Sequence, residues 1–495
     1  MEREKDILPE NINKIYKDRL AKLLRMQELG INPYPDSFEK THRSVEVLQQ
    51  PELLGQEVSV AGRLMSIRKM GKINFAHIQD EKDRLQLYFS IEKLGQSGME
   101  FFNRFLDIGD IVGAIGVVFK TRTKETTINV EEFCLLSKCL RLLPEKFHGL
   151  RDPEILYRQR YLDLLTNPET RRRFEIRTRV VKNMRLILDS YDFTEVETPI
   201  LQTEASGASA KPFITHHNAL DLDLYLRLAP ETYLKRLLVG GLERVYEIGR
   251  NFRNEGIDAS HLQDFTMLEF YAAYWNARKN LAFTENLIKQ VALGVTGKTK
   301  FIVEGKEVDF SGTWPIRTYR EVVLRHSGVD IDEASSIQEL REIIKERNIP
   351  IEKMDSLNLG QLIDKLYKTT TRPYLIDPQF LVEFPTSLSP LARGMDKKPG
   401  YVDQFQLLVG GWEVAKGYSE LVDPIEQRKR LVEQATLRRE GDEEAMPLDE
   451  DYIKAMEYGM PPNSGVGIGI DRLVVILTET ENLRNIIFFP LTRPK

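Results

Sequence analysis

The chain has 495 residues, of which 41% are hydrophobic and 29% are charged, and its formal net charge is -5. This composition is typical of a globular protein with several domains, and it excludes a chain-wide basic field for binding polyanions. The chain has only two cysteines, which excludes a disulfide scaffold and favours the reducing cytoplasm. Its N-terminal segment is charged, and no apolar run approaches the roughly 18 to 20 residues of a membrane span, so a membrane protein is excluded as well.

The first predicted element is an amphipathic helix over residues 12–29, which Gly30, Pro33 and Pro35 terminate. Five short strand-like runs follow between residues 57 and 136, and a short helix-like segment separates the third run from the fourth. This order matches the OB-fold, a small β-barrel that is often used to bind oligonucleotides. A generic small β-barrel without a ligand is the alternative.

One edge of the predicted barrel is basic and carries aromatic residues. Arg68 and Lys69 precede Phe75, and Tyr88 follows in the next strand-like run. Cations supply affinity for phosphate, and aromatic rings supply stacking surfaces for unpaired bases. Each of these residues alone is better explained as part of a solvated surface or a core, but their combination with the barrel favours a nucleic-acid partner.

The rest of the chain is predicted to form a second domain of the α+β class. We place the N-terminal domain at residues 1–145, a linker rich in Pro, Arg and Asp at 146–170, and a catalytic domain at 171–495. Within the catalytic domain, helical patterns at about 281–375 indicate a helical insertion. Because strands and helices do not alternate as in βαβ units, we expect an antiparallel sheet flanked by helices.

A charged loop between two apolar strand-like runs is the first candidate site. "RVYEIGRNF" and "DFTMLEFYAAY" are predicted to pair as a hairpin, and the loop "RNEGIDASHLQ" between them is longer than a tight turn requires. Arg253 can offer a planar set of donors to phosphate or carboxylate, His261 adds a donor, and a buried Glu269 would select a cationic ligand. A structural Arg–Glu pair within the hairpin explains this stretch equally well.

A glycine-rich strand near the C-terminus is the second candidate. In "GVGIGIDRLVVIL", Gly465, Gly467 and Gly469 alternate, so one face of the strand carries no side chains and a flat ring could lie against it. Asp471 then opens a helical run and places Arg472 in its first turn. A strand packed closely against another backbone would give the same pattern, so this signal is weak without the hairpin.

These stretches resemble the three motifs of class II aminoacyl-tRNA synthetases: "TEVETPIL", "GRNFRNEG" with "FTMLEF", and "GVGIGIDR". Longer segments, such as "LRLAPETYLKRLLVGGLERVYEIGRNFRNEG", resemble the lysyl-tRNA synthetase family within that class. The similarity spans nearly the whole chain and is weakest at about 281–375. It implies an N-terminal OB-fold anticodon-binding domain, a class II antiparallel sheet flanked by helices, and a homodimer.

The resemblance also implies a two-step reaction of a lysine–tRNA ligase on ATP, L-lysine and tRNA. Lysine attacks the α-phosphate of ATP to give lysyl-adenylate and pyrophosphate, and the lysyl group then passes to the terminal ribose of tRNA(Lys). The residues implied in ATP binding are Arg253, Glu255, His261, Phe265, Glu413 and Arg472, with catalytic roles for Arg253 and Arg472. Those implied in lysine binding are Gly207, Glu231, Glu269, Tyr271, Lys416, Tyr418 and Glu420. Magnesium would meet Glu413 and Gln406, and Arg68, Phe75 and Gln86 would contact the anticodon.

Two residues of the implied site depart from the family pattern. Gln406 stands where the family usually has Glu, which removes one charge from a site for Mg²⁺. Lys416 stands where Asn is usual, and it could pair with the substrate carboxylate or neutralise Glu420. From the sequence alone, we expect Lys416→Asn to leave lysine activation intact or improve it, and Gln406→Glu to lower the magnesium requirement.

Strand alternation would place Glu413 and Glu420 on opposite faces, so a bulge between them is expected if both line one site. The departures also leave two alternative functions open: a paralogue that activates a related amino acid or modifies another target, and a non-catalytic descendant that binds tRNA or protein. A related enzyme that reads the carboxylate of aspartate would need cations in its pocket, and the acids in this chain argue against it.

Overall fold

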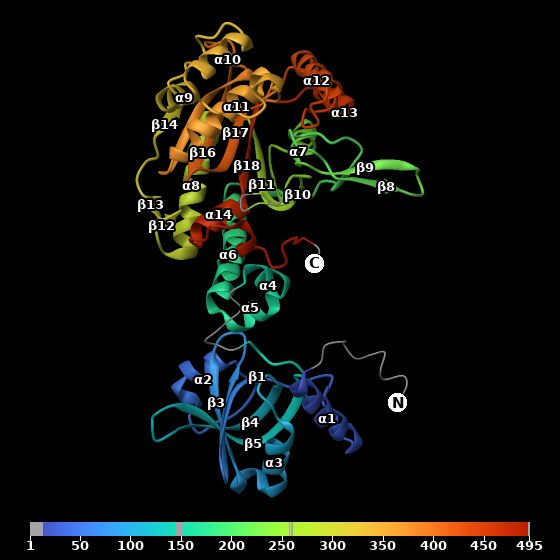
Figure 1. Ribbon diagram of the computed structural model, residues 1–495, viewed down its shortest axis with the longest axis vertical. Coiled ribbons are helices and arrows are strands. Elements are labelled where there is room, and N and C mark those ends of the chain that lie inside the picture. The colour runs from blue at the N-terminus through green and yellow to red at the C-terminus, as the bar shows by residue number, and fades with distance from the viewer. Residues whose placement is uncertain (1–12, 145–151, 257, 259–260, 494–495) are drawn as a thin grey trace. The chain divides into compact units, whose positions relative to one another are not determined.

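The protein is described by a computed structural model covering residues 13–144, 152–256, 258 and 261–493. It forms two compact units, residues 1–150 and 151–495 (Figure 1). The helices α4 (Pro153–Arg158) and α5 (Arg160–Thr166) belong to the second unit, although the sequence suggested a linker at 146–170. The buried Arg160 attaches them there, because its guanidinium donates to the backbone oxygen of Phe488 at 3.1 Å.

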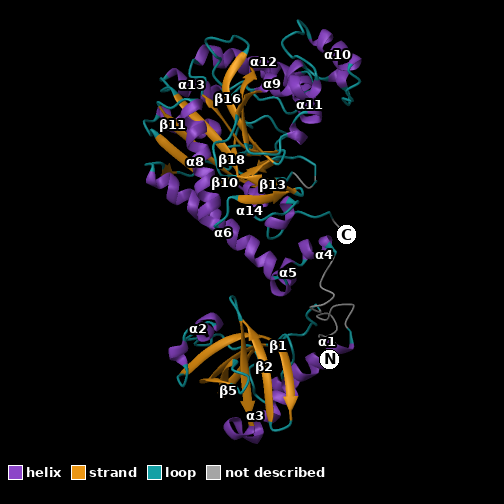
Figure 2. Ribbon diagram, turned by 90° about the vertical axis from the view of Figure 1, so that its left-hand side faces the viewer, coloured by secondary structure: helices purple, strands orange, loops and turns teal. Residues whose placement is uncertain are grey.

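The first unit is a closed five-stranded barrel with the strand order β1-β2-β3-β5-β4 (Figure 2). Helix α3 lies between β3 and β4 in the chain, so the predicted OB-fold order is confirmed. The elements are α1 (Lys14–Glu28), α2 (Ser44–Gln49), β1 (Glu57–Met70), β2 (Ile73–Gln79), β3 (Arg84–Ser90), α3 (Ile91–Phe105), β4 (Ile111–Lys120) and β5 (Thr126–Ser137).

Alternating apolar residues fill the barrel. Along β2, Ala76 and Ile78 are fully buried, while the alternate residues Phe75 and His77 are only partly buried. Leu85, Leu87 and Phe89 of β3 also face the core. Period-two alternation is the pattern that a strand with one face on a core must have, and it leaves the other face to solvent or a ligand.

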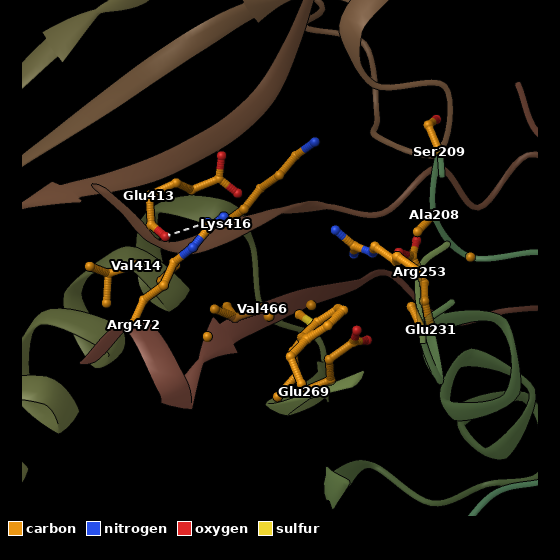
Figure 3. Close-up of a pocket in the computed structure, with 18 of the residues that line it drawn as sticks. Ala208, Ser209, Glu231, Arg253, Glu269, Glu413, Val414, Lys416, Val466 and Arg472 are labelled. Atoms are coloured by element: carbon orange, nitrogen blue, oxygen red, sulfur yellow. Dashed lines mark hydrogen bonds between the residues drawn. The ribbon is translucent and has the colours of Figure 1, made fainter. Parts of the chain in front are cut away.

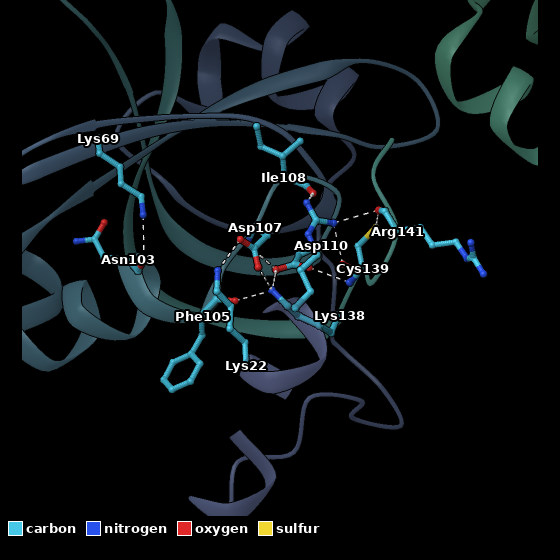
Figure 4. Close-up of polar contacts among 11 residues, drawn as sticks. Lys22, Lys69, Asn103, Phe105, Asp107, Ile108, Asp110, Lys138, Cys139 and Arg141 are labelled. Carbon is cyan, nitrogen blue, oxygen red and sulfur yellow. Dashed lines mark hydrogen bonds and ion pairs between the residues drawn. The ribbon is translucent and has the colours of Figure 1, made fainter. Parts of the chain in front are cut away.

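A buried lysine joins the end of β5 to the segment between α3 and β4. The Nζ atom of Lys138 donates to the backbone oxygen of Phe105 at 2.6 Å and to the carboxylates of Asp107 and Asp110 at 2.6 and 2.8 Å (Figure 4). Lys22 of α1 also pairs with Asp107 at 2.6 Å. Helix α1 is therefore attached to the barrel through this cluster, in which the fully buried charges of Lys138 and Asp110 compensate each other.

We expect Lys138→Met to destabilise the barrel by about 3–5 kcal/mol, because it leaves the buried carboxylate of Asp110 without its cation. Hydrogen exchange of the β4 and β5 amides in the full chain measures this change. Lys69→Met is the control, since Lys69 is exposed and donates a hydrogen bond to the backbone oxygen of Asn103, and its effect should stay below about 0.5 kcal/mol. Equal effects of the two substitutions would contradict a structural role for the cluster.

The second unit is built on an eight-stranded sheet with the order β14-β15-β16-β17-β18-β11-β10-β6. Its pairs are antiparallel except for β10 with β6 and β14 with β15. The strands are β6 (Thr194–Glu195), β10 (Arg244–Phe252), β11 (Asp264–Ala273), β14 (Ile316–Thr318), β15 (Gln379–Pro385), β16 (Tyr401–Val409), β17 (Trp412–Ser419) and β18 (Asn463–Gly469). The predicted α+β class with an antiparallel sheet is confirmed.

Three helices contribute with the sheet to one large apolar core: α6 (Pro168–Ser190), α8 (Ala277–Thr296) and α14 (Ile470–Leu477). Smaller elements surround the sheet: β7 (Leu201–Gln202), β8 (Ile214–His217), β9 (Leu222–Leu226), α7 (Glu231–Val239), β12 (Lys300–Val303), β13 (Lys306–Asp309), α9 (Tyr319–Ser327), α10 (Ile337–Glu346), α11 (Leu359–Thr370), α12 (Pro424–Arg439) and α13 (Glu450–Glu457). No helix among the described residues is long and apolar enough to cross a bilayer.

The segment at about 281–375 differs from the helical insertion that its sequence suggested. It includes the hairpin β12–β13, and β14 pairs with β15 as the edge strand of the main sheet. Helix α8, which begins at Ala277, belongs to the central core rather than to a peripheral element. The strands of this segment are only three or four residues long, which is too short for a clear alternation of apolar residues.

Candidate active site

A cavity of about 320 Å³ lies against strands β11, β17 and β18 of the second unit (Figure 3). Twelve of the residues that the resemblance implies in ATP and lysine binding line it: Gly207, Glu231, Arg253, Glu255, His261, Phe265, Glu269, Tyr271, Glu413, Lys416, Tyr418 and Arg472. Gln406 and Glu420 lie behind this lining and are buried. The predicted residues thus converge although they come from segments up to 265 residues apart, Gly207 to Arg472.

The hairpin β10–β11 forms as predicted, with Arg244 opposite Ala272 and Phe252 opposite Asp264. In its loop, the guanidinium of Arg253 lies over the ring of Phe265, 4.9 Å from the ring centroid. His261 is held by Asp258, which accepts from the backbone N–H of His261 at 2.8 Å. Adenine stacking on Phe265 would therefore have to use the opposite face of the ring or displace Arg253.

Carboxylates gather on the other side of the cavity. Glu231, the first residue of α7, accepts hydrogen bonds from the Tyr418 hydroxyl and from Nζ of Lys235, both at 2.6 Å. Glu269 of β11 accepts from the Tyr271 hydroxyl at 3.1 Å. Burial and the nearby charge of Glu231 raise the pKa of Glu269 to about 8. This recess is suited to positively charged ligand groups, whose arrival would favour the ionised carboxylate.

Lys235 is a residue of this site that the sequence analysis missed. Its side chain is fully buried, and its ammonium group pairs with both Glu231 and Glu420. Burial opposes its ionisation, but the two carboxylates outweigh that effect and raise the pKa of Lys235 well above its ordinary value. The cation that neutralises Glu420 is therefore Lys235 and not Lys416. The four-residue spacing of Glu231 and Lys235 at the start of a helix was the available signal.

Glu420 nevertheless keeps an oxygen without a hydrogen-bond partner. Both of its carboxylate oxygens are buried, and neither has a hydrogen bond among the described residues, although Lys235 makes an ion pair with Oε2. The Oε1 atom lies beside the bare backbone of Gly465, where a Cβ atom would approach it to 2.7 Å. A buried unpaired carboxylate oxygen is costly unless a ligand satisfies it, so this corner is suited to bind an ammonium group.

The bare face of β18 is filled by side chains of its neighbours. A Cβ atom at Gly465 would lie 2.1 Å from the Tyr271 ring, whereas one at Gly469 would meet nothing closer than 3.7 Å. We expect Gly465→Ala to cost about 1–3 kcal/mol of overpacking and to raise roughly 10- to 100-fold the KM for the lysine that the resemblance implies as substrate. Gly469→Ala is the matched control, and steady-state kinetics of both variants measure the effect. Equal KM values would show that this corner does not receive the amino acid.

The hairpin β16–β17 contains the expected bulge. Leu408 pairs with Glu413 and Leu407 with Ala415, so Val414 is the extra residue. This shift allows Glu413 and Lys416 to line the same cavity as Tyr418. Burial opposes ionisation of Glu413, but Arg472, Lys416, Arg372 and Lys368 together lower its pKa. The prediction of a bulge is confirmed, and it explains how residues of unequal spacing share one site.

Asp471 has a structural role that the sequence did not reveal. Its carboxylate accepts from the backbone N–H of Thr266 at 2.7 Å and pairs with Arg177 of α6. Arg177 also donates to the Thr266 hydroxyl at 2.9 Å. The start of α14, which carries Arg472, is thereby fixed to the hairpin strand, and Arg472 donates to the backbone oxygen of Glu413 at 2.8 Å.

The predicted nucleic-acid residues of the barrel lie on neighbouring strands. Arg68 of β1 pairs with Phe75 of β2, and the Phe75 ring lies 5.2 Å from the ring of Tyr88 on β3. Gln86 is buried, and its amide donates to Glu125 at 2.8 Å and accepts from Thr127 at 2.8 Å. Phe75 and Tyr88 thus form an aromatic surface, whereas Gln86 would have to exchange a protein partner to contact a base.

Comparison with known proteins agrees with this architecture. Residues 152–493 match the family model of class II tRNA synthetases (D, K and N), and residues 58–136 match that of the OB-fold nucleic acid binding domain. The chain thus combines the fold and the motifs of a class II tRNA synthetase.

Full-length relatives narrow this class. A lysine–tRNA ligase of Pelotomaculum thermopropionicum is 47% identical over 98% of this chain and 96% of its own length. That of Clostridium tetani is 43% identical over 99% of both chains, and that of Aquifex aeolicus is 48% identical over 88% of this chain and 73% of its own. The protein belongs to the lysine–tRNA ligase family.

Proposed function

We propose that this protein ligates lysine to tRNA(Lys) with ATP, through a lysyl-adenylate intermediate. The observation that carries the proposal is the charge of the recess. Glu231, Glu269 and Glu420 supply three carboxylates, and Lys235 supplies one fixed ammonium. The ionised recess thus has room for two further positive charges, the number that the α- and ε-ammonium groups of lysine carry.

In the first step, an oxygen of the lysine carboxylate attacks the α-phosphorus of ATP, and the bond to pyrophosphate breaks. Both reactants are anions, so a cation between them lowers their repulsion, and Arg253, which lines the cavity, would supply it. In the second step, a ribose hydroxyl of the tRNA attacks the lysyl carbonyl carbon and AMP leaves. Magnesium would accompany ATP as the counter-ion of its triphosphate.

Pyrophosphate exchange with each amino acid in turn tests the activation step. We expect labelled pyrophosphate to be incorporated into ATP when lysine is present, and not when any other protein amino acid replaces it. Exchange with a different amino acid would favour the paralogue, and the absence of exchange with any would favour the non-catalytic descendant. Charging of tRNA(Lys) then tests the second step.

We also propose a cytoplasmic homodimer whose barrel contacts the anticodon. The proposal for the barrel rests on the ring pair of Phe75 and Tyr88 beside Arg68. The resemblance of the segment from α6 to β6 to the first class II motif supports the dimer. Light scattering of the purified chain would show its mass, and a monomer at micromolar concentration would refute the dimer.

A further inference from the structure

The residues that the resemblance assigns to magnesium do not form a divalent-cation site in this chain. Gln406 donates from its Nε2 atom to the carboxylate of Glu413, and its Oε1 atom accepts from the Tyr367 hydroxyl at 3.3 Å. The amide thus turns an N–H group toward the position where a metal ligand would be needed. Magnesium prefers several oxygen ligands at short range, and this corner offers one carboxylate that is already bonded.

The surroundings of Glu413 are also cationic. Arg372, Lys368, Lys416 and Arg472 all lie close enough to stabilise its ionised form. Four positive side chains around one carboxylate oppose the binding of a divalent cation, because each repels it at short range. The same side chains favour a polyanion such as a triphosphate.

Three of these four cations have protein partners. Lys368 pairs with Asp364 at 2.7 Å, and Arg372 donates to the backbone oxygen of Gly411 at 2.9 Å. Arg472 donates to the backbone of Glu413. Lys416, by contrast, makes no hydrogen bond or ion pair with any described residue, and it lines the cavity. Its ammonium group is the one of the four that is left for a ligand.

The position of Lys416 connects it to the two residues of the lost metal site. It pairs directly with Gln406 across β16 and β17, and the bulge at Val414 brings Glu413 to the same cavity. In the view of Figure 3, its side chain extends from β17 beyond Glu413, on the side where Arg253 approaches. The Lys416 ammonium group therefore lies between Glu413, which the resemblance implies in ATP binding, and Arg253, which is proposed to contact the α-phosphate.

The charges of the two departures are complementary. A glutamine in place of a glutamate makes the corner more positive by one charge, and a lysine in place of an asparagine adds one more. Together they equal the charge of one divalent cation. Each departure alone would supply only half of the positive charge that a divalent cation brings to the triphosphate. The two departures together supply all of it, with the Lys416 ammonium group in place of a bound metal ion.

We propose that the Lys416 ammonium replaces a protein-held divalent cation at the phosphates of ATP. This inference rests on the proposed function, because it concerns the ATP that the activation step consumes. Lys416 would donate hydrogen bonds to phosphate oxygens and neutralise part of their charge, as lysine does in other phosphate sites. Lys416→Asn is therefore expected to impair activation, because it removes a cation that no bound metal ion replaces. This expectation is the opposite of the one drawn from the sequence alone.

The test compares the full-length wild type with Lys416→Asn, Gln406→Glu and the double variant. Electron paramagnetic resonance counts the Mn²⁺ ions bound per chain with saturating α,β-methylene-ATP, and pyrophosphate exchange is followed against magnesium concentration. We expect the double variant to bind at least one Mn²⁺ ion more than the wild type. We also expect Lys416→Asn to lower exchange roughly 10- to 100-fold, and the double variant to recover activity only at several-fold higher magnesium.

Lys300→Asn is the matched control, since Lys300 is exposed and pairs with Glu307 in the hairpin β12–β13, away from the cavity lining. Equal Mn²⁺ counts and equal magnesium dependence in the wild type and the double variant would overturn the inference. A rise in the KM for lysine alone in Lys416→Asn would also overturn it, since that result assigns Lys416 to the amino-acid carboxylate. If the wild type does not bind the nucleotide analogue, the proposed function fails together with the inference, whereas binding with an unchanged metal count removes the inference alone.

Discussion

Arg253→Ala is expected to lower kcat/KM for lysine-dependent pyrophosphate exchange by about 10³-fold. The physical reason is that the guanidinium is the cation proposed to lie between two reacting anions, and loss of one such donor typically costs 10²–10³-fold in rate. Its Nε atom is buried and has no hydrogen-bond partner among the described residues, so the group is available to a ligand. Pyrophosphate-exchange kinetics at lysine concentrations below and above the KM measures the loss.

Arg250→Ala is the control for this substitution. Arg250 lies on β10, three positions before Arg253, but its side chain is 41% exposed and pairs with Asp264 at 3.1 Å outside the cavity. Its removal should change the rate less than about threefold, because an exposed ion pair contributes little. Equal losses in both variants would mean that the hairpin, rather than the reacting groups, needs the arginines.

Glu269→Gln is expected to have the second large effect, on lysine activation and on stability together. The variant cannot supply the charge that an ammonium group needs in a buried site, so kcat/KM for lysine should fall by at least about 100-fold. Exchange kinetics gives this value. The Glu342→Gln variant is the control, since Glu342 lies exposed on α10.

The stability of the wild type relative to this variant should depend on pH in a defined direction. The pKa of Glu269 is about 8 in the folded protein, above the ordinary value of 4.5. The folded state therefore binds this proton more tightly than the unfolded state, and the stability that it contributes is present at low pH and is lost as pH rises through 8. A glutamine has no proton to lose.

The unfolding free energy of Glu269→Gln relative to the wild type should thus increase between pH 6 and pH 9, by an amount on the order of a few kcal/mol. The melting temperature of the variant should rise relative to that of the wild type over the same range. Calorimetry without lysine measures it. A difference that does not change with pH would mean that Glu269 is already ionised in the empty enzyme. Saturating lysine should remove the pH dependence in the wild type, because its ammonium group stabilises the charged carboxylate.

Local sequence patterns were sufficient for the elements that carry the site. Apolar alternation predicted the barrel strands and the β10–β11 hairpin, and the spacing of Gly465, Gly467 and Gly469 predicted a bare strand face. These features depend on the period of two along a strand, which the order of residues specifies directly. A bulge between Glu413 and Glu420 also followed from the spacing of these two acids, and the structure places it at Val414.

The partners across the cavity were decided only by the tertiary structure. Nothing local connects Lys235 to Glu420, which lies 185 positions later, or Asp471 to Arg177, yet both pairs hold the site together. Likewise, the identities of Gln406 and Lys416 specify their charges, but only the register of β16 with β17, which the bulge shifts, makes them direct cross-strand partners beside Glu413. Sequence fixes which charges exist and which strand face they take, whereas electrostatic partners depend on distances that the packing of remote elements sets.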